Sequence, residues 1–151
     1  SNSKIIYCYR NPLDNIKEIY KTNLGTRHTY SCSIIESASL WIESHSLMKE
    51  YKKRYSSKIY FMNYDKLVCE PEEEIKSLLH WLGWDFESKY LIPSLDGTTI
   101  GFSDISKSKM IKKDYLGSWK NYRELLSPAI KIFEKNPLSS PLIKSSFHNK
   151  Y

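Results

Sequence analysis

Apolar residues along this chain follow two patterns, short continuous runs and longer stretches with helical spacing. Residues 5–9 (Ile-Ile-Tyr-Cys-Tyr) form a run that is too short for a helix and lacks strict alternation, which predicts a strand buried on both faces. Residues 58–63, rich in aromatic side chains, predict a second strand. Apolar residues spaced three or four apart predict helices near residues 12–22, 33–55, 71–82 and 128–135. This alternation indicates an α/β fold in which parallel strands are flanked by helices.

Local signals mark the ends of these helices. Pro12 follows the first strand and suits the first helical position. Ser33, with Glu36 three residues later, predicts a capping box at the start of the longest helix. The acidic run after Pro71 is typical of a helix start and is not interpreted as a metal site. Gly83 is expected to end that helix.

The length of 151 residues indicates a single domain spanning residues 1–151. The last segment, residues 136–151, is rich in Ser and Pro and is expected to be a loosely held tail. The chain has no initiator Met and opens almost directly on a strand predicted to be buried. Because domains rarely begin on a central strand, we expect an N-terminally truncated domain whose preceding segment is missing from this sequence.

The charge of the chain favours an anionic partner. The formal net charge is +6, and the stretch from Ser103 to Arg123 holds six basic residues against two acidic ones. Such a charge allows nucleic acid, a membrane surface or a phosphorylated small molecule. No apolar run approaches the roughly 20 residues of a membrane span, and no signal peptide is visible. The three cysteines, Cys8, Cys32 and Cys69, lack CxxC spacing, which argues against zinc and favours a reducing compartment such as the cytoplasm.

Arg10 is the first candidate for a functional residue. It lies at the C-terminal end of the first predicted strand, just before a helix. In open α/β sheets this crevice is where ligands bind, and a guanidinium beside a helix N-terminus suits a phosphate. The alternative is an ordinary surface arginine at a strand end. His45, on the apolar stripe of the longest helix, is interpreted as a core histidine rather than a catalytic base.

Three stretches together resemble the sulfotransferases that use PAPS (3′-phosphoadenosine 5′-phosphosulfate) as sulfuryl donor. KIIYCYRNPLDNI, from Lys4, resembles their strand–Arg–helix motif for the 3′-phosphate. Tyr64-Asp65-Lys66-Leu67, with Pro71 and the helix ending at Gly83, is similar to their Tyr-Glu-Asp-Leu run. KKDYLGSWKN, from Lys112, is similar to their C-terminal Arg-Lys-Gly-x-x-Gly-x-Trp-Lys-Asn motif. Tyr30-Ser31 resembles the bacterial branch often fused to tetratricopeptide repeats. The resemblance covers about residues 4 to 135 and implies a partial P-loop-like sulfotransferase fold.

The resemblance also implies roles for individual residues. Arg10 would bind the 3′-phosphate of PAPS, and Lys112 and Lys113 stand where the family's Arg-Lys pair reaches the same phosphate. Trp119 would pack under that loop, as a structural anchor as readily as a ligand contact. We therefore expect Arg10, Lys112 and Lys113 to converge in the folded chain.

Several positions depart from the family pattern. Glu18 stands where the family has a phosphate-binding Ser, and it would repel a phosphate if it faced the same pocket, where it should pair with one of the three cations. Ser106 and Ser108 fall near the positions of a family Gln and Arg, and Asp114 replaces a Gly. The Gly-rich loop that binds the 5′-phosphosulfate is not in this sequence. No catalytic residue is therefore assigned, and the chain alone is expected to transfer no sulfuryl group.

Three functions are compatible with these observations. The favoured one is the C-terminal part of a cytoplasmic sulfotransferase that passes a sulfuryl group from PAPS to a hydroxyl or amine, with the acceptor unidentified. The second is a non-catalytic binding or interaction module with the same fold, which Glu18, Ser106 and Ser108 favour. The third, a nucleic-acid binder, rests on charge alone, since no nucleic-acid motif occurs.

Overall fold

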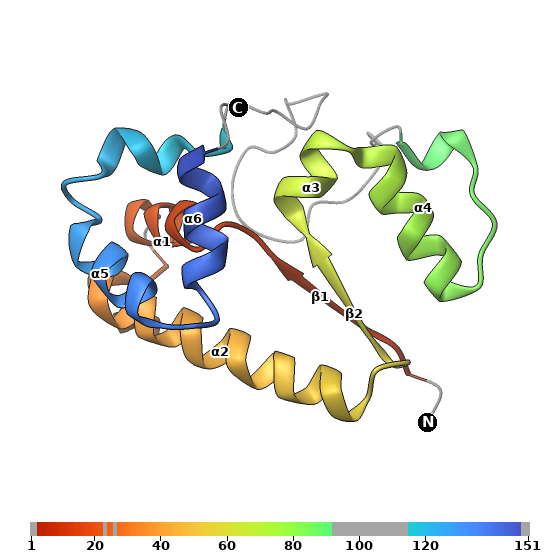
Figure 1. Cartoon of the computed structure of the whole chain (residues 1–151), viewed down its shortest axis with the longest axis horizontal. Helices are drawn as coiled ribbons and strands as arrows, with labels where there is room; N and C mark the ends of the chain where they lie inside the picture. Colours follow the sequence, from red (N-terminus) through yellow and green to blue (C-terminus); the bar gives the residue numbers. More distant parts are fainter. Residues whose placement is uncertain (1–2, 23, 26, 92–114, 149–151) are drawn as a thin grey trace.

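The computed structural model describes residues 3–22, 24–25, 27–91 and 115–148, without the side chains of residues 145–148. Two parallel strands, β1 (Ile5–Tyr9) and β2 (Ile59–Asn63), form a sheet in which Ile5 lies opposite Ile59. Figure 1 shows the sheet between two groups of helices. Both predicted strands and the α/β class are confirmed.

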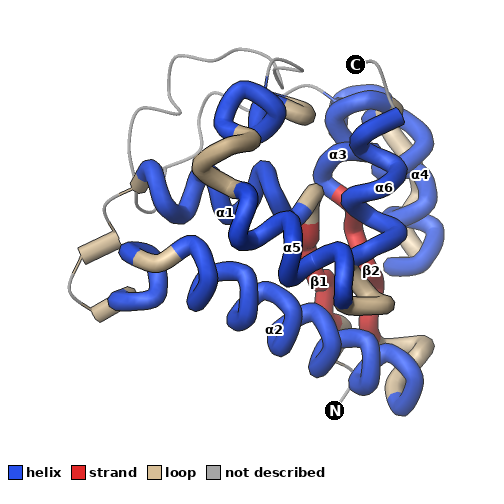
Figure 2. The backbone as a smooth tube through the Cα atoms, turned by 60° about the vertical axis from the view of Figure 1, so that its left-hand side comes forward, coloured by secondary structure: helices blue, strands red, loops and turns tan. Residues whose placement is uncertain are grey.

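Helices make up most of the described chain. Between the strands and after β2 come α1 (Pro12–Lys21), η1 (Thr29–Cys32), α2 (Ile34–Arg54), α3 (Tyr64–Cys69), α4 (Pro71–Leu82), η2 (Ser88–Leu91), η5 (Ser118–Tyr122), α5 (Ser127–Lys135) and α6 (Ser140–His148). The C-terminal helices α5 and α6 return to lie against α1 and α2, on the side of the molecule away from α4 (Figure 1). Figure 2 shows α5 beside α2 from a second direction. Within the described residues, no helix is both long enough and apolar enough to cross a bilayer.

The main hydrophobic core is built from helices rather than from the sheet. Its fully buried members include Leu13 and Ile16 of α1, Phe133 of α5 and Ile143 of α6. Ile143 corrects the expectation of a loosely held tail, since residues 140–148 are helical and this side chain is buried in the core. The Ser- and Pro-rich composition of the segment masked the apolar contacts that hold it, which include Leu142 packed against the same core.

The prediction that the first strand is buried on both faces is wrong. Ile5 and Ile6 of β1 are 51% and 42% exposed, whereas Ile59 of β2 is 2% exposed. In the described part of the chain β1 pairs along one edge only, with β2. Helix α4 covers the sheet over β2, where Trp81 packs against Tyr60, and beside β1 the Trp81 ring is contacted by the Lys4 ammonium.

Side-chain caps explain where two helices begin. The Ser33 hydroxyl accepts a hydrogen bond from the Glu36 N–H at 3.2 Å, which confirms the predicted start of α2. Residues 65–67 belong to helix α3, which was not among the predicted helices. The Asn63 side chain accepts from the N–H groups of Asp65 and Lys66 and so starts this helix directly at the end of β2.

His45 is a core histidine, as predicted. It is 2% exposed and stacks on Trp41, with ring centroids 4.7 Å apart. A hydrogen bond of 3.2 Å links its Nδ1 to the Tyr7 hydroxyl of β1. Burial, with a smaller effect from the charge of Lys49, lowers the pKa of His45 to about 4. The ring is therefore neutral at physiological pH.

Candidate functional site

Arg10 lies between the end of β1 and the start of α1, where the sequence placed it. The N-cap of α1 is Asn11, whose side-chain oxygen accepts hydrogen bonds from the N–H groups of Leu13 and Asp14. The helix therefore begins two residues after Arg10, with Pro12 at its first position. Because the Arg10 side chain is 18% exposed, its guanidinium is partly buried yet still open to a ligand.

Two carboxylates flank the Arg10 guanidinium. Its Nη2 lies 4.0 Å from Asp14 Oδ2, and its Nε lies 3.9 Å from Asp65 Oδ1. The Tyr64 ring lies below it, 5.3 Å from Cζ to the ring centroid, a cation–π distance. Both Arg10 Nε and Asp65 Oδ1 are buried without a hydrogen-bond partner among the described residues. Arg10 is thus held by charge and still has donor capacity to spare.

Asp65 joins the middle motif to the first one. Its Oδ2 accepts a hydrogen bond of 2.6 Å from the Asn11 N–H, so α3 is tied to the start of α1. Burial raises the pKa of Asp65, while the Asn11 N–H and the Arg10 charge act in the opposite direction. This carboxyl lies beside the Arg10 guanidinium and is placed to tune how strongly that group attracts an anion.

The C-terminal motif reaches the same place. Arg10 Nη2 donates a hydrogen bond of 3.3 Å to the Tyr115 carbonyl, across 105 positions of sequence. The three stretches that carry the family resemblance therefore meet at Arg10. Lys112 and Lys113 lie outside the described residues, so their convergence with Arg10 stays a prediction.

Asp14 holds the C-terminal motif against α1. Its carboxylate accepts from the Gly117 N–H at 2.8 Å, the Trp119 N–H at 2.9 Å and the Ser118 hydroxyl at 3.1 Å. Gly117 has φ +67°, a left-handed conformation that glycine adopts without strain and that turns successive N–H groups toward one acceptor. Asp14 is fully buried, so its carboxylate is shielded from water where it accepts these hydrogen bonds.

The other predicted site residues have defined surroundings. Trp119 is 0% exposed and belongs to the hydrophobic core. Of its two expected roles, structural anchor and ligand contact, this burial corresponds to the structural anchor. Glu18 pairs with its neighbour Lys17, Oε1 to Nζ 2.7 Å, and no ion pair joins it to Arg10. The predicted pairing of Glu18 with Lys112 or Lys113 involves residues outside the described part of the chain and stays a prediction.

Sequence reasoning assigned no site role to Asp14, Lys17, Asp65 or Ser118. Asp14 lies in the first turn of α1, where an acid suits the helix dipole. Its spacing four residues after Arg10 was the available signal, since side chains at i and i+4 share a helix face. The roles of Lys17 and Ser118 depend on a contact between residues 101 positions apart, for which a single sequence offers no signal.

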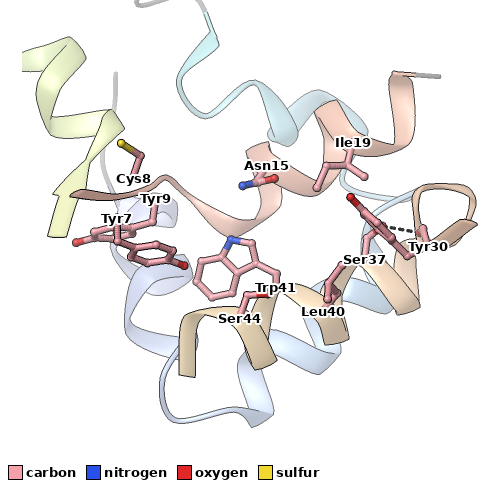
Figure 3. Close-up of a pocket in the computed structure, with 10 residues that line it drawn as sticks. All are labelled: Tyr7, Cys8, Tyr9, Asn15, Ile19, Tyr30, Ser37, Leu40, Trp41 and Ser44. Atoms are coloured by element: carbon pink, nitrogen blue, oxygen red, sulfur yellow. Dashed lines mark hydrogen bonds between the residues drawn. The ribbon is translucent and has the colours of Figure 1, made fainter. Parts of the chain in front are cut away.

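A cavity of about 240 Å³ is lined by residues of β1, α1 and α2 and by Tyr30. Figure 3 shows Tyr7, Tyr9 and Trp41 at one end of it and Tyr30 with Ile19 at the other. None of its ten lining residues carries a charge. Its chemistry is therefore opposite to that around Arg10, and it suits an uncharged group rather than a phosphate.

No group of three potential metal ligands occurs in the described part of the chain. The acidic run is the start of α4, with Pro71 at its first position, as predicted. The three cysteines are free thiols, and Cys8 and Cys32 are exposed.

Comparison with known proteins places the chain in a family. The model of the sulfotransferase family matches residues 1–88, more than half of its length. The chain belongs to the sulfotransferase family. The match includes Arg10 and Asp65 but ends before the C-terminal motif, which the fold brings to Arg10 through Tyr115.

The chain is also similar to an uncharacterized protein of Aquifex aeolicus (strain VF5). The two are 25% identical over 138 residues, which cover 89% of this chain and 18% of that protein. This sulfotransferase family member thus spans less than a fifth of the length of that relative. No solved structure matches this chain.

Proposed function

We propose that this chain forms the part of a PAPS-dependent sulfotransferase that binds the 3′-phosphate of the donor. The complete enzyme would transfer a sulfuryl group to a hydroxyl or amine acceptor. The observation that carries the proposal is the position of Arg10, at the end of β1, where it contacts Asp65 of the middle motif and Tyr115 of the last. A site that unites three motifs of a transferase family is the natural place for its shared substrate.

The groups around Arg10 fit a phosphate. The guanidinium lies at the N-terminal end of α1, where the helix dipole favours negative charge. Its Nε is buried beside Asp65 Oδ1, so a ligand would contact the guanidinium through its other N–H donors, and the side chain as a whole is 18% exposed. Lys112 and Lys113 would add two cations. Charge-assisted hydrogen bonds are worth roughly 1.5–3 kcal/mol each, so these three residues would dominate donor affinity.

The second candidate is a binding module that keeps the fold without the chemistry. Asp14 and Asp65 already flank Arg10, and Glu18 stands nearby on the same helix. Two carboxylates beside one arginine disfavour a phosphate dianion unless further cations offset them. These features favour an interaction module if nucleotide binding fails.

Calorimetric titration with adenosine 3′,5′-bisphosphate tests the proposal. The folded chain is expected to bind this nucleotide, and Arg10→Ala is expected to abolish binding because it removes the central cation. Arg54→Ala is the matched control, since Arg54 is exposed at the far end of α2 and carries the same charge. A parent chain that is folded but does not bind the nucleotide would favour the interaction module instead.

A further inference from the structure

Lys17 is an unusually buried lysine. Its side chain is 9% exposed, although lysines are almost always on the surface. The ammonium donates a short hydrogen bond to the Ser118 hydroxyl and pairs with Glu18. The Tyr122 ring lies 5.9 Å away. A buried ammonium needs partners for all of its donors, and the ones it has here are a hydroxyl, a partly exposed carboxylate and a ring.

Lys17 lies on the same face of α1 as the residues around Arg10. Asp14 connects the two cations, because its Oδ2 is 4.0 Å from Arg10 Nη2 and its Oδ1 is 3.1 Å from Ser118 Oγ. Ser118 Oγ in turn accepts from Lys17. Arg10 and Lys17 therefore flank one buried cluster that joins α1 to the turn at residues 117–119.

We propose that Lys17 is a second cation of the anion site and exchanges Glu18 for a phosphate oxygen when a ligand binds. The identity of the ligand rests on the proposed function, whereas the role of Lys17 as an anion contact does not. Glu18 is suited to leave, since its side chain is 38% exposed and can return to water at little cost. Asp14 is not, because its carboxylate accepts from three donors of the buried turn.

This exchange resolves the charge problem at residue 18. A carboxylate in the place of a phosphate-binding serine would repel the ligand on its own. Paired with Lys17, it is neutralised in the free protein, and its departure from Lys17 exposes a cation where the ligand needs one. Glu18 then sets the affinity by competing with the ligand, which a serine would not do.

The test is titration of the whole chain at low ionic strength with inorganic phosphate and, separately, with adenosine 3′,5′-bisphosphate. Lys17→Met keeps the length and the apolar stem of the side chain and should weaken binding of both about tenfold or more, the loss expected for a charge-assisted contact. Lys17→Arg should restore binding to within about threefold of the parent, and Glu18→Gln should strengthen it by removing the competitor. Lys21→Met, on the exposed last turn of α1, should leave binding unchanged.

A direct readout guards against variants that fail to fold. The side-chain nitrogen NMR signal of Lys17 in the parent should shift on addition of phosphate and should already be shifted in Glu18→Gln. Binding of phosphate that depends on Lys17, without binding of the nucleotide, supports the inference and counts against the proposed function. If the Lys17 signal stays in place on saturation, if Lys17→Met binds as the parent does, or if the parent binds neither ligand, the inference is wrong.

Discussion

Asp14 and His45 are both buried polar residues, and the fold accommodates them in different ways. Asp14 is surrounded by donors, two backbone N–H groups and a hydroxyl, all from the turn that follows Gly117. His45 is surrounded by rings and has the Tyr7 hydroxyl as a hydrogen-bond partner. A polar side chain surrounded by donors links two segments, whereas one surrounded by rings mainly adds a titratable group to the core.

The pH dependence of stability should reveal the lowered pKa of His45. Its pKa is about 4 in the folded chain, against an ordinary value of 6.5. Between these values the unfolded chain binds a proton that the folded chain does not, so the free energy of unfolding falls as the pH drops through this range, by up to about 3 kcal/mol. Urea unfolding from about pH 7 to about pH 4 should show a weaker decline in His45→Phe than in the parent. Equal declines would contradict this account.

Asp14→Asn should cost at least about 2 kcal/mol of stability. An amide offers one acceptor oxygen in place of two, so at least one buried N–H of the turn loses its partner and faces another donor. The free energy of urea unfolding measures the loss. Glu43→Gln, the same carboxylate-to-amide change on the exposed face of α2, serves as control and should change stability by less than about 0.5 kcal/mol.

At the scale of elements, the sequence predicted those helix ends that are determined by neighbouring residues. Proline, serine and glycine placed the ends of α1, α2 and α4 to within about two residues, because capping is settled by a few neighbouring groups. Helix α3 was missed because Asn63 ends a strand and caps a helix at once. The exposure of β1 was missed because burial depends on what lies against a strand. Likewise, Arg10 was predicted from its motif, whereas the hydrogen bonds of Asp14 to residues 117–119 became visible only in the folded chain.

The contrast between the two strands is measurable at one position of their register. Ile5 and Ile59 are direct partners in the sheet, but only Ile59 is buried. Ile59→Ala should lower the free energy of unfolding by about 2–4 kcal/mol, and Ile5→Ala by less than about 1 kcal/mol. Similar losses at both positions would mean that β1 is covered in solution.

At the scale of the whole molecule, the core joins the first third of the chain to its last quarter. Leu13 of α1, Trp41 of α2 and Ile143 of α6 belong to one cluster, while the sheet and α4 lie to one side (Figure 1). Arg10 lies where β1 meets α1, and its bond to Tyr115 follows the same long-range arrangement. The candidate site therefore depends on the C-terminal helices being in place.

Ile143→Ala should show how much α6 contributes to the core on which this arrangement rests. The side chain is fully buried, so the substitution should lower the free energy of unfolding by about 2–5 kcal/mol. Ile35→Ala, at a 54% exposed position of α2, is the matched control and should cost less than about 1 kcal/mol. If Ile143→Ala unfolds like the control, α6 contributes little to the core.

The same long-range core sets the order in which the protein can fold during synthesis. Ribosomes add roughly 5–20 residues per second. The ring of Trp41 packs against Phe133, made about 90 residues later, so it waits on the order of 5–20 s for that partner. Throughout that interval the apolar faces of α1 and α2 are open to chaperones and to other nascent chains. Yield in the cell should therefore depend on chaperone supply more than the stability of the finished fold suggests.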